Sequence, residues 1–276
     1  MELKILCPLW GHGHLPIFSF LEKVRSAGFD GFDTWIPEDK VERQILYDYL
    51  QQFEMPLVAH QYQAHGATFR QFKASFIKRL TECAVAQPVL INSHTGRDWF
   101  TVQENIELID IAHDFSIKTG IPVVHETHRG RLGYAPQSAA EMFQLCEQYL
   151  LTADFSHWTC VTESMLENFE HIMDEAIKRT RHVHARIGHE NGPQVPDPRA
   201  SEWSYASKKF LTWWERIVLE NKRAGRLVLT FTTEFGPPPY MPTLPFSNAP
   251  VADPFEINCF MKDVLKSRYT DLAGAR

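Results

Sequence analysis

The chain of 276 residues is long enough for one large barrel domain or two ordinary domains, and either would bury an ample core without disulfides. Its hydrophobic fraction of 44% and its charged fraction of 22% are typical of a soluble globular protein. The formal net charge of −6 disfavours nucleic acid and anionic membranes as partners and favours a small molecule.

The cysteines and the amino terminus indicate the compartment. The five cysteines are odd in number and form no CxxC pair, so neither a disulfide framework nor a thiolate metal site is expected. The first segment, MELKILCPLWGHGH, has an early charge and only a short apolar run, which fits neither a secretory signal nor a membrane-spanning helix. We therefore expect a cytoplasmic protein with no membrane partner.

Short apolar runs alternate with longer amphipathic segments along the chain. Eight runs have the composition of strands: 3–9, 31–36, 56–61, 88–94, 121–127, 150–155, 182–187 and 227–235. Apolar residues recur three or four positions apart between these runs, which predicts helices; examples are Ile17, Phe20, Val24 and Ala27, then Val102, Ile106, Ile109 and Ala112, then Phe210, Trp213 and Ile217. Gly28, Gly120 and Gly225 are placed to end these three helices.

Eight strand–helix repeats over this length predict a (β/α)8 TIM barrel, formed by residues 1–276 as a single domain. The main alternative is an open doubly wound sheet. It is disfavoured because no glycine-rich phosphate loop follows the first strand. The proline-rich stretch 236–254 and the segment PQVPDPR are expected to be rim loops after the eighth and seventh strands.

Four residues with metal-binding side chains stand at or near the carboxyl ends of the last four strands. The runs IPVVHETHRG, LLTADFSHW, RHVHARIG and LVLTFTTEFG contain, in this order, Glu126, Asp154, His184 and Glu234. Because all strand ends of a parallel barrel face one cavity, these side chains are expected to converge. Three carboxylates and an imidazole predict a site for a divalent metal ion.

Strand parity extends this site, because residues two apart on a strand point to the same face. The predicted inward faces combine Thr230 and Thr232 with Glu234, Val124 with Glu126, His182 and His184 with Arg186, Val58 with His60, and Leu90 and Asn92 with His94. Polar residues become more frequent toward the carboxyl ends of the strands, as the mouth of an active site requires.

This pattern resembles the xylose isomerase-like TIM barrel superfamily, which includes sugar isomerases and epimerases, inositol-catabolism dehydratases and isomerases, and metal-dependent apurinic endonucleases. The resemblance spans nearly the whole chain and implies that Glu126, Asp154, His184 and Glu234 hold a divalent metal ion. The segment DFSH is similar to the DxxH motif of the family, which implies that His157 contacts the substrate or a second metal. HVHARIGHENGPQVPDPR is similar to the seventh-strand region of sugar isomerase/epimerase-like members. Family members are often homodimers or homotetramers.

Some positions depart from the family pattern. Ketose epimerases carry an arginine six residues after the histidine ligand and a glutamate six residues after the first ligand, where this chain has Glu190 and Leu132. Their sugar contacts are therefore not carried over. In the endonucleases a histidine is expected two residues after Asp197, where this chain has Arg199, so a complete trinuclear centre is not expected.

The chemistry implied by the resemblance is proton transfer. Shifting a carbonyl along a sugar requires removal of a proton beside the carbonyl, and a cation must stabilise the resulting enediolate. Our hypothesis is that Glu126 and Glu234 flank the substrate, one removing the proton and the other returning it. Residues expected to contact the substrate are His157, Arg186, His128, His60, His94, Trp10 and Trp35, the two tryptophans by stacking on a sugar.

The ligand set suits Mn²⁺, Mg²⁺ or Co²⁺, and Zn²⁺ is an alternative if His60 or His94 joins it. Whether a second metal binds at His60 and His94 is left open by the sequence. We therefore predict a divalent-metal-dependent isomerase or epimerase of a sugar or sugar phosphate, with a small polar substrate and no nucleic acid. Three alternatives remain. They are a dehydratase or isomerase of inositol-derived or hydroxypyruvate-like compounds, an apurinic-endonuclease-like phosphodiester hydrolase, and a barrel that binds a metabolite without turning it over.

Overall fold

The computed structural model describes residues 1–274, and its centre is a closed barrel of eight parallel strands in chain order. The strands are β1 (Glu2–Pro8), β2 (Gly31–Thr34), β3 (Leu57–Gln61), β4 (Leu90–Ser93), β5 (Val123–Glu126), β6 (Leu151–Ala153), β7 (Thr180–His184) and β8 (Val228–Thr232). Pairing of β1 with β8, in register from Glu2 with Val228 to Leu6 with Thr232, closes the barrel. The predicted fold class is confirmed.

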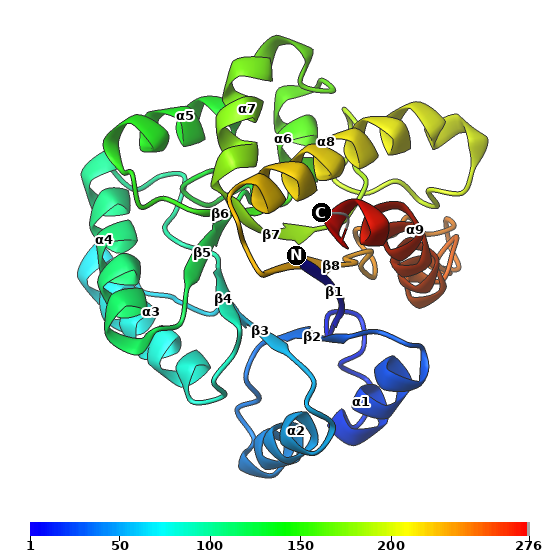
Figure 1. The fold of residues 1–276 in the computed structure, drawn as a ribbon, viewed down its shortest axis with the longest axis horizontal. Helices are drawn as coiled ribbons and strands as arrows, with labels where there is room; N and C mark the ends of the chain where they lie inside the picture. Colours follow the sequence, from blue (N-terminus) through cyan, green and yellow to red (C-terminus); the bar gives the residue numbers. More distant parts are fainter. Residues whose placement is uncertain (275–276) are drawn as a thin grey trace.

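The helices form a ring around the barrel (Figure 1). They are α1 (Ile17–Ser26), α2 (Lys40–Phe53), α3 (Phe69–Ala84), α4 (Val102–Thr119), α5 (Pro136–Leu145), α6 (Phe155–Thr162), α7 (Glu170–Arg179), α8 (Ser204–Arg223) and α9 (Pro254–Gly274), with short 3-10 turns at Glu167–Phe169 and Ser201–Trp203. In the part of the chain that the structure describes, none of the helices is both long and apolar enough to cross a membrane.

All eight predicted strands are present, with shifted ends. The seventh begins at Thr180 instead of 182, and most strands end before the predicted residue because the chain turns into a loop at the rim. The short helix α6 was not predicted. Its first turn follows β6 directly because the side chain of Asp154 accepts a hydrogen bond from the backbone N–H of Ser156.

The predicted helical faces are largely buried. Gly120 ends α4 in the left-handed conformation, with φ of 73°. The prediction for the first turn of α4 is wrong in part, because Val102 is exposed there and Leu108 is buried in its place further along the helix. Phe210, Trp213 and Ile217 of α8 are buried as expected.

The barrel interior changes character along its axis. Leu6, Val58, Leu90 and Val124 form a small cluster of their own inside the barrel, while their strand neighbours belong to the main core beneath the helices. Two residues further along the inward faces stand His60, Asn92 and Glu126. The apolar layer therefore closes one end of the barrel, and polar side chains fill the end at which the strands finish.

Helix α9 holds the segment that follows β8. The side chain of Asn258 accepts a hydrogen bond from the Phe235 N–H and donates one to the Phe235 carbonyl, each at 2.9 Å. Asn258 is 1% exposed. Because Phe235 adjoins Glu234, this pair of bonds fixes the backbone that carries a predicted metal ligand.

We expect Asn258→Ala to lower the free energy of unfolding by about 2–4 kcal/mol, because it leaves a buried N–H and a buried carbonyl unpaired. Denaturant unfolding would measure this. Asn221→Ala is a matched control, since Asn221 of α8 donates to the carbonyls of Thr180 and Ile217 at the opposite end of the barrel. Both variants should be destabilised, but only Asn258→Ala should speed hydrogen exchange at Phe235. Unchanged stability of Asn258→Ala would contradict the anchoring role.

Candidate metal centre and active site

The four predicted ligands converge at the polar end of the barrel. Glu126 ends β5, Asp154 follows β6, His184 ends β7, and Glu234 lies two residues beyond β8. Each offers one ligand atom, and these atoms all lie within 4.8 Å of one another. All four side chains are buried. Strands far apart in sequence therefore bring together the donor set that the sequence predicted.

The orientation of His184 leaves one ring nitrogen facing the carboxylates. Nδ1 lies 3.0 Å from Glu234 Oε2 and 3.6 Å from Glu126 Oε2. Neither Nδ1 nor Glu234 Oε2 makes a hydrogen bond of acceptable geometry to another described residue. Burial alone would lower the pKa of His184, but the charges of Glu234 and Glu126 outweigh it and hold this pKa well above its ordinary value. A positive charge is thus favoured between these groups, and the donor set fits a divalent cation.

Arg186 is the buried cation of the cluster. Its guanidinium contacts Asp154 Oδ2, its Nη1 lies 3.4 Å from Glu234 Oε2, and its Nε donates to Ser156 Oγ at 3.1 Å. It also faces the ring of Tyr240 at 4.8 Å. The single positive charge of Arg186 neutralises only part of the charge of the buried carboxylates Glu126, Asp154 and Glu234. The remaining negative charge favours a further cation.

Asp154 uses its two oxygens differently. Oδ1 caps α6, and Oδ2 faces Arg186. Burial, with the nearby charges of Glu234 and Glu126, raises the pKa of Asp154 to about 7, although Arg186 acts in the opposite direction. Near neutral pH this carboxyl group therefore competes for a proton as well as for a cation.

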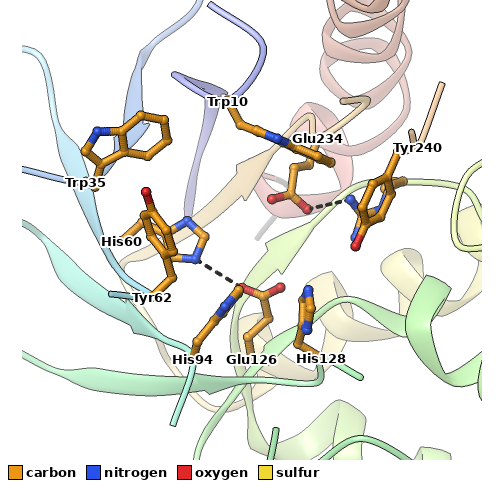
Figure 2. A pocket seen from close by; sticks show the side chains of 10 residues that line it. Trp10, Trp35, His60, Tyr62, His94, Glu126, His128, Glu234 and Tyr240 are labelled. Carbon is orange, nitrogen blue, oxygen red and sulfur yellow. Dashed lines mark hydrogen bonds and ion pairs between the residues drawn. The ribbon is translucent and has the colours of Figure 1, made fainter. Parts of the chain in front are cut away.

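A cavity of about 270 Å³ opens in front of the cluster. Its lining consists of Trp10, Trp35, His60, Tyr62, His94, Glu126, His128, Arg186, Glu234 and Tyr240 (Figure 2). Trp35 and Tyr62 form one edge-to-face pair, with ring centroids 5.6 Å apart, and Trp10 and Tyr240 form another at 4.9 Å. The two aromatic pairs flank the carboxylates, which suits a small ring or polyol with apolar faces and polar edges.

Three histidines on the cavity wall lie next to Glu126. His94 Nε2 is 3.0 Å and His60 Nε2 is 3.6 Å from Glu126 Oε2, while the tilted ring of His128 packs against His94 with centroids 4.4 Å apart. Burial lowers the pKa of His60 to about 4 and that of His128 well below its ordinary value. The wall therefore presents these two rings as neutral imidazoles.

The partners of these histidines fix where their protons lie. Arg131 Nη2, which can only donate, is 3.3 Å from His94 Nδ1, so the proton of a neutral His94 is on Nε2 and points to Glu126. His128 Nδ1 lies 2.6 Å from the carbonyl of Arg129, which can only accept. The proton of a neutral His128 is therefore on Nδ1, and Nε2 carries a lone pair. His60, His94 and Glu126 are close enough to hold a second ion, but His94 is oriented as a donor.

His157 lies deeper than the sequence suggested. It is fully buried, its Nε2 accepts a hydrogen bond from Arg186 at 3.0 Å, and it is outside the cavity lining. On the rim, Arg199 pairs with Asp197 at 2.6 Å, which occupies that carboxylate without a metal.

Three residues of the site were not predicted from the sequence. Tyr62 lies two positions after His60, so strand parity could have indicated it. Asp33, in the middle of β2, accepts a hydrogen bond from His184 inside the barrel, and parity alone could not assign a partner. Tyr240 comes from the loop after β8, where no periodic pattern exists.

No protein-family model matches the chain, and no curated protein sequence matches it either. Several solved structures are similar to it in fold. A 3-keto-D-glucoside 4-epimerase from E. coli has a TM-score of 0.61 at 11% identity, over 96% of this chain and 100% of the epimerase. Endonuclease IV from Thermus thermophilus has a TM-score of 0.57 at 13% identity, over 96% of this chain and 98% of the endonuclease.

A third similar structure is a xylose isomerase-like TIM barrel protein from Mycobacterium smegmatis in complex with magnesium. Its TM-score is 0.57 at 10% identity, over 85% of this chain and 91% of that protein. Identities this low establish the fold and leave the reaction open. The chain has the fold of the xylose isomerase-like TIM barrels, in agreement with the resemblance predicted from its strand-end residues.

Proposed function

We propose that the protein is a divalent-metal-dependent isomerase or epimerase of a small sugar or sugar derivative, with Glu126, Asp154, His184 and Glu234 as the metal ligands. The observation that carries the proposal is the pair of buried atoms His184 Nδ1 and Glu234 Oε2, 3.0 Å apart at the centre of four converging donors. Three oxygen donors and one imidazole favour Mn²⁺, Mg²⁺ or Co²⁺, with Zn²⁺ as an alternative.

The bound ion would supply positive charge that stabilises the substrate oxygens once a neighbouring carbon loses its proton. Side chains of the protein orient and carry out the proton transfer. Asn92 Nδ2 and His94 Nε2 donate to Glu126 Oε2 at 2.7 and 3.0 Å, which holds this carboxylate in one orientation. Burial would raise the pKa of Glu126, but His94 and His184 outweigh it and keep this pKa well below its ordinary value. Glu126 is thus ionised and able to accept a proton.

Glu234 lines the same cavity from the segment after β8, whereas Glu126 comes from β5. The Glu234 carboxylate faces His184 and Arg186. We assign it the return of the proton to the neighbouring carbon. Arg186 and His128 line the cavity and are assigned to the substrate oxygens, and the two aromatic pairs are assigned to the apolar faces of the substrate. His157 acts through Arg186 in this proposal, because it is buried behind the guanidinium.

The alternative reactions are supported less. A phosphodiester hydrolase of the endonuclease type would use further metal ions, whereas His94 is oriented as a donor by Arg131 and Asp197 is paired with Arg199. A dehydratase would use the same ion and the same base and would differ in expelling water from the substrate. Product analysis therefore separates dehydratase from isomerase.

We expect the protein, purified without chelator, to contain about one divalent ion per chain. Glu234→Ala should lose most of it, because two of the closest donor atoms belong to Glu234 and His184. Elemental analysis of both proteins measures this. Glu256→Ala, on the exposed first turn of α9, is a control that should keep the ion. A parent protein that takes up no Mn²⁺, Mg²⁺, Co²⁺ or Zn²⁺ would contradict the proposal and favour a metabolite-binding barrel.

Solvent exchange tests the proton transfer. In D₂O the parent protein should introduce deuterium beside the carbonyl of a keto sugar within a panel of ketoses and keto acids, observed by NMR. Glu126→Gln should abolish the exchange, by a factor of about 100 or more, while the barrel stays folded. Normal exchange by a Glu126→Gln variant that still binds metal would overturn the assignment of the base. Loss of water from the substrate in place of exchange would favour the dehydratase.

Metal binding should release protons and strengthen with rising pH. The raised pKa of His184 keeps it protonated at neutral pH, and the pKa of Asp154 is about 7, so an ion must displace protons from both groups. Between about pH 6 and about pH 8 the affinity for Mn²⁺ should rise about tenfold per pH unit for each proton released. Calorimetry in two buffers of different ionisation enthalpy counts these protons. An identical heat in both buffers would show that neither group carries a proton before binding.

A further inference from the structure

We propose that Asp33 is a positioning residue that fixes the tautomer and the orientation of His184, so that His184 presents Nδ1 to the metal ion. This inference rests on the metal site proposed above. It concerns a residue of β2, which belongs to the opposite half of the barrel sequence and is not one of the four ligands.

Asp33 lies inside the barrel, 2% exposed, beneath the ligand cluster. Its Oδ2 accepts a hydrogen bond from Thr232 Oγ1 at 2.8 Å and lies 3.0 Å from His184 Nε2. His182 Nε2 is 3.3 Å from the same oxygen. An ionised carboxylate can only accept, so His184 carries a proton on Nε2. When Nδ1 carries no proton, its lone pair is directed at Glu234 and Glu126, where the ion would bind.

The contact of Asn92 with His184 shows why the tautomer of His184 must be fixed. Its Nδ2 donates to Glu126 Oε2 at 2.7 Å, which sets the orientation of the amide. The same Nδ2 lies 3.2 Å from His184 Nε2. An amide N–H beside Nε2 favours the tautomer with the proton on Nδ1, which cannot bind a metal through that nitrogen. The carboxylate of Asp33 on the other side of Nε2 favours the opposite tautomer and, because it is charged, makes the stronger hydrogen bond.

The charge of Asp33 adds a second effect. A carboxylate that accepts the N–H of a metal-binding imidazole makes the other nitrogen more basic and holds the ring in one orientation. A carboxylate buried among apolar residues is costly unless it is hydrogen-bonded. Here it accepts hydrogen bonds from His184, from His182 and from Thr232 at the end of β8, two residues before Glu234. Asp33 thus connects the segments that carry two of the four ligands.

The test is the affinity for Mn²⁺, measured by calorimetry at one pH. Asp33→Asn keeps the size of the side chain and removes the charge, and it should weaken Mn²⁺ binding about 10-fold to 100-fold. Asp30→Asn is the matched control. Asp30 stands just before the same strand, where it accepts from the Ile5 N–H at 2.7 Å and pairs with Lys266 at 2.8 Å, far from the ligand end. It should leave the affinity unchanged.

A double-mutant cycle separates positioning from general damage. If Asp33 acts through His184, then Asp33→Asn should weaken Mn²⁺ binding much less in a His184→Gln background than in the parent. The nitrogen coupling of bound Mn²⁺ in pulsed EPR should also be reduced or lost in Asp33→Asn, which simple loosening of the barrel would not cause. An equal loss of affinity in both backgrounds, or an Asp33→Asn affinity within twofold of the parent, would overturn the inference.

Two further measurements keep the test decisive. Thr232→Val removes the hydroxyl that donates to Asp33 and preserves the carboxylate, so it should weaken Mn²⁺ binding by about threefold to tenfold even if Asp33→Asn does not fold. Unchanged affinity of Thr232→Val with an unfolded Asp33→Asn would count against the inference. The parent titration identifies failure of the proposed function: a parent that binds no ion refutes the metal site itself, whereas a parent that binds and an insensitive Asp33→Asn refute only the role of Asp33.

Discussion

Burial of several carboxylates at one end of the barrel is the constraint on which the site depends. Three carboxylates, those of Glu126, Asp154 and Glu234, are each at most 6% exposed. Their mutual repulsion would be severe without positively charged partners. Arg186 supplies one such partner, and the raised pKa of His184 reflects the demand for another. A divalent ion satisfies this demand better than a proton does, because it can contact several carboxylates at once. The electrostatics of the barrel and its proposed chemistry thus have the same origin.

The scaffold tolerates this concentration of charge because the apolar layer is kept separate from it. Leu90 and Val124 close the barrel interior, and Asn92 and Glu126 follow two residues later on the same faces. The main core lies outside the strands, beneath the helices. The packed apolar residues and the residues of the proposed chemistry therefore lie in different layers of the same strands, as is usual for this architecture. Substitution of a polar residue in the upper layer need not disturb the packing below it.

The hydrogen bonds of two histidines distinguish this cavity from a site built to hold several metals. Arg131 turns His94 into a donor toward Glu126, and Arg186 takes the lone pair of His157. His94 then contacts Glu126 and His157 contacts Arg186, which fits the single metal centre that we propose. Together with the aromatic pairs, this arrangement favours a small polar substrate held between ring faces over a charged phosphodiester backbone.

The sequence by itself determined the barrel and the four converging donors. Strand periodicity and the position of a residue at a strand end are local properties, and parallel closure makes every strand end face one cavity. Only the tertiary structure decided which groups meet across the interior. Asp33 and His184 are 151 residues apart, and their contact depends on barrel closure and the inward direction of β2. The proton positions on His94 and His157 likewise depend on contacts with Arg131 and Arg186. Strand parity predicted that Arg186 points inward, but no periodic pattern encodes which histidine each arginine meets, because these contacts follow from packing and long-range charge.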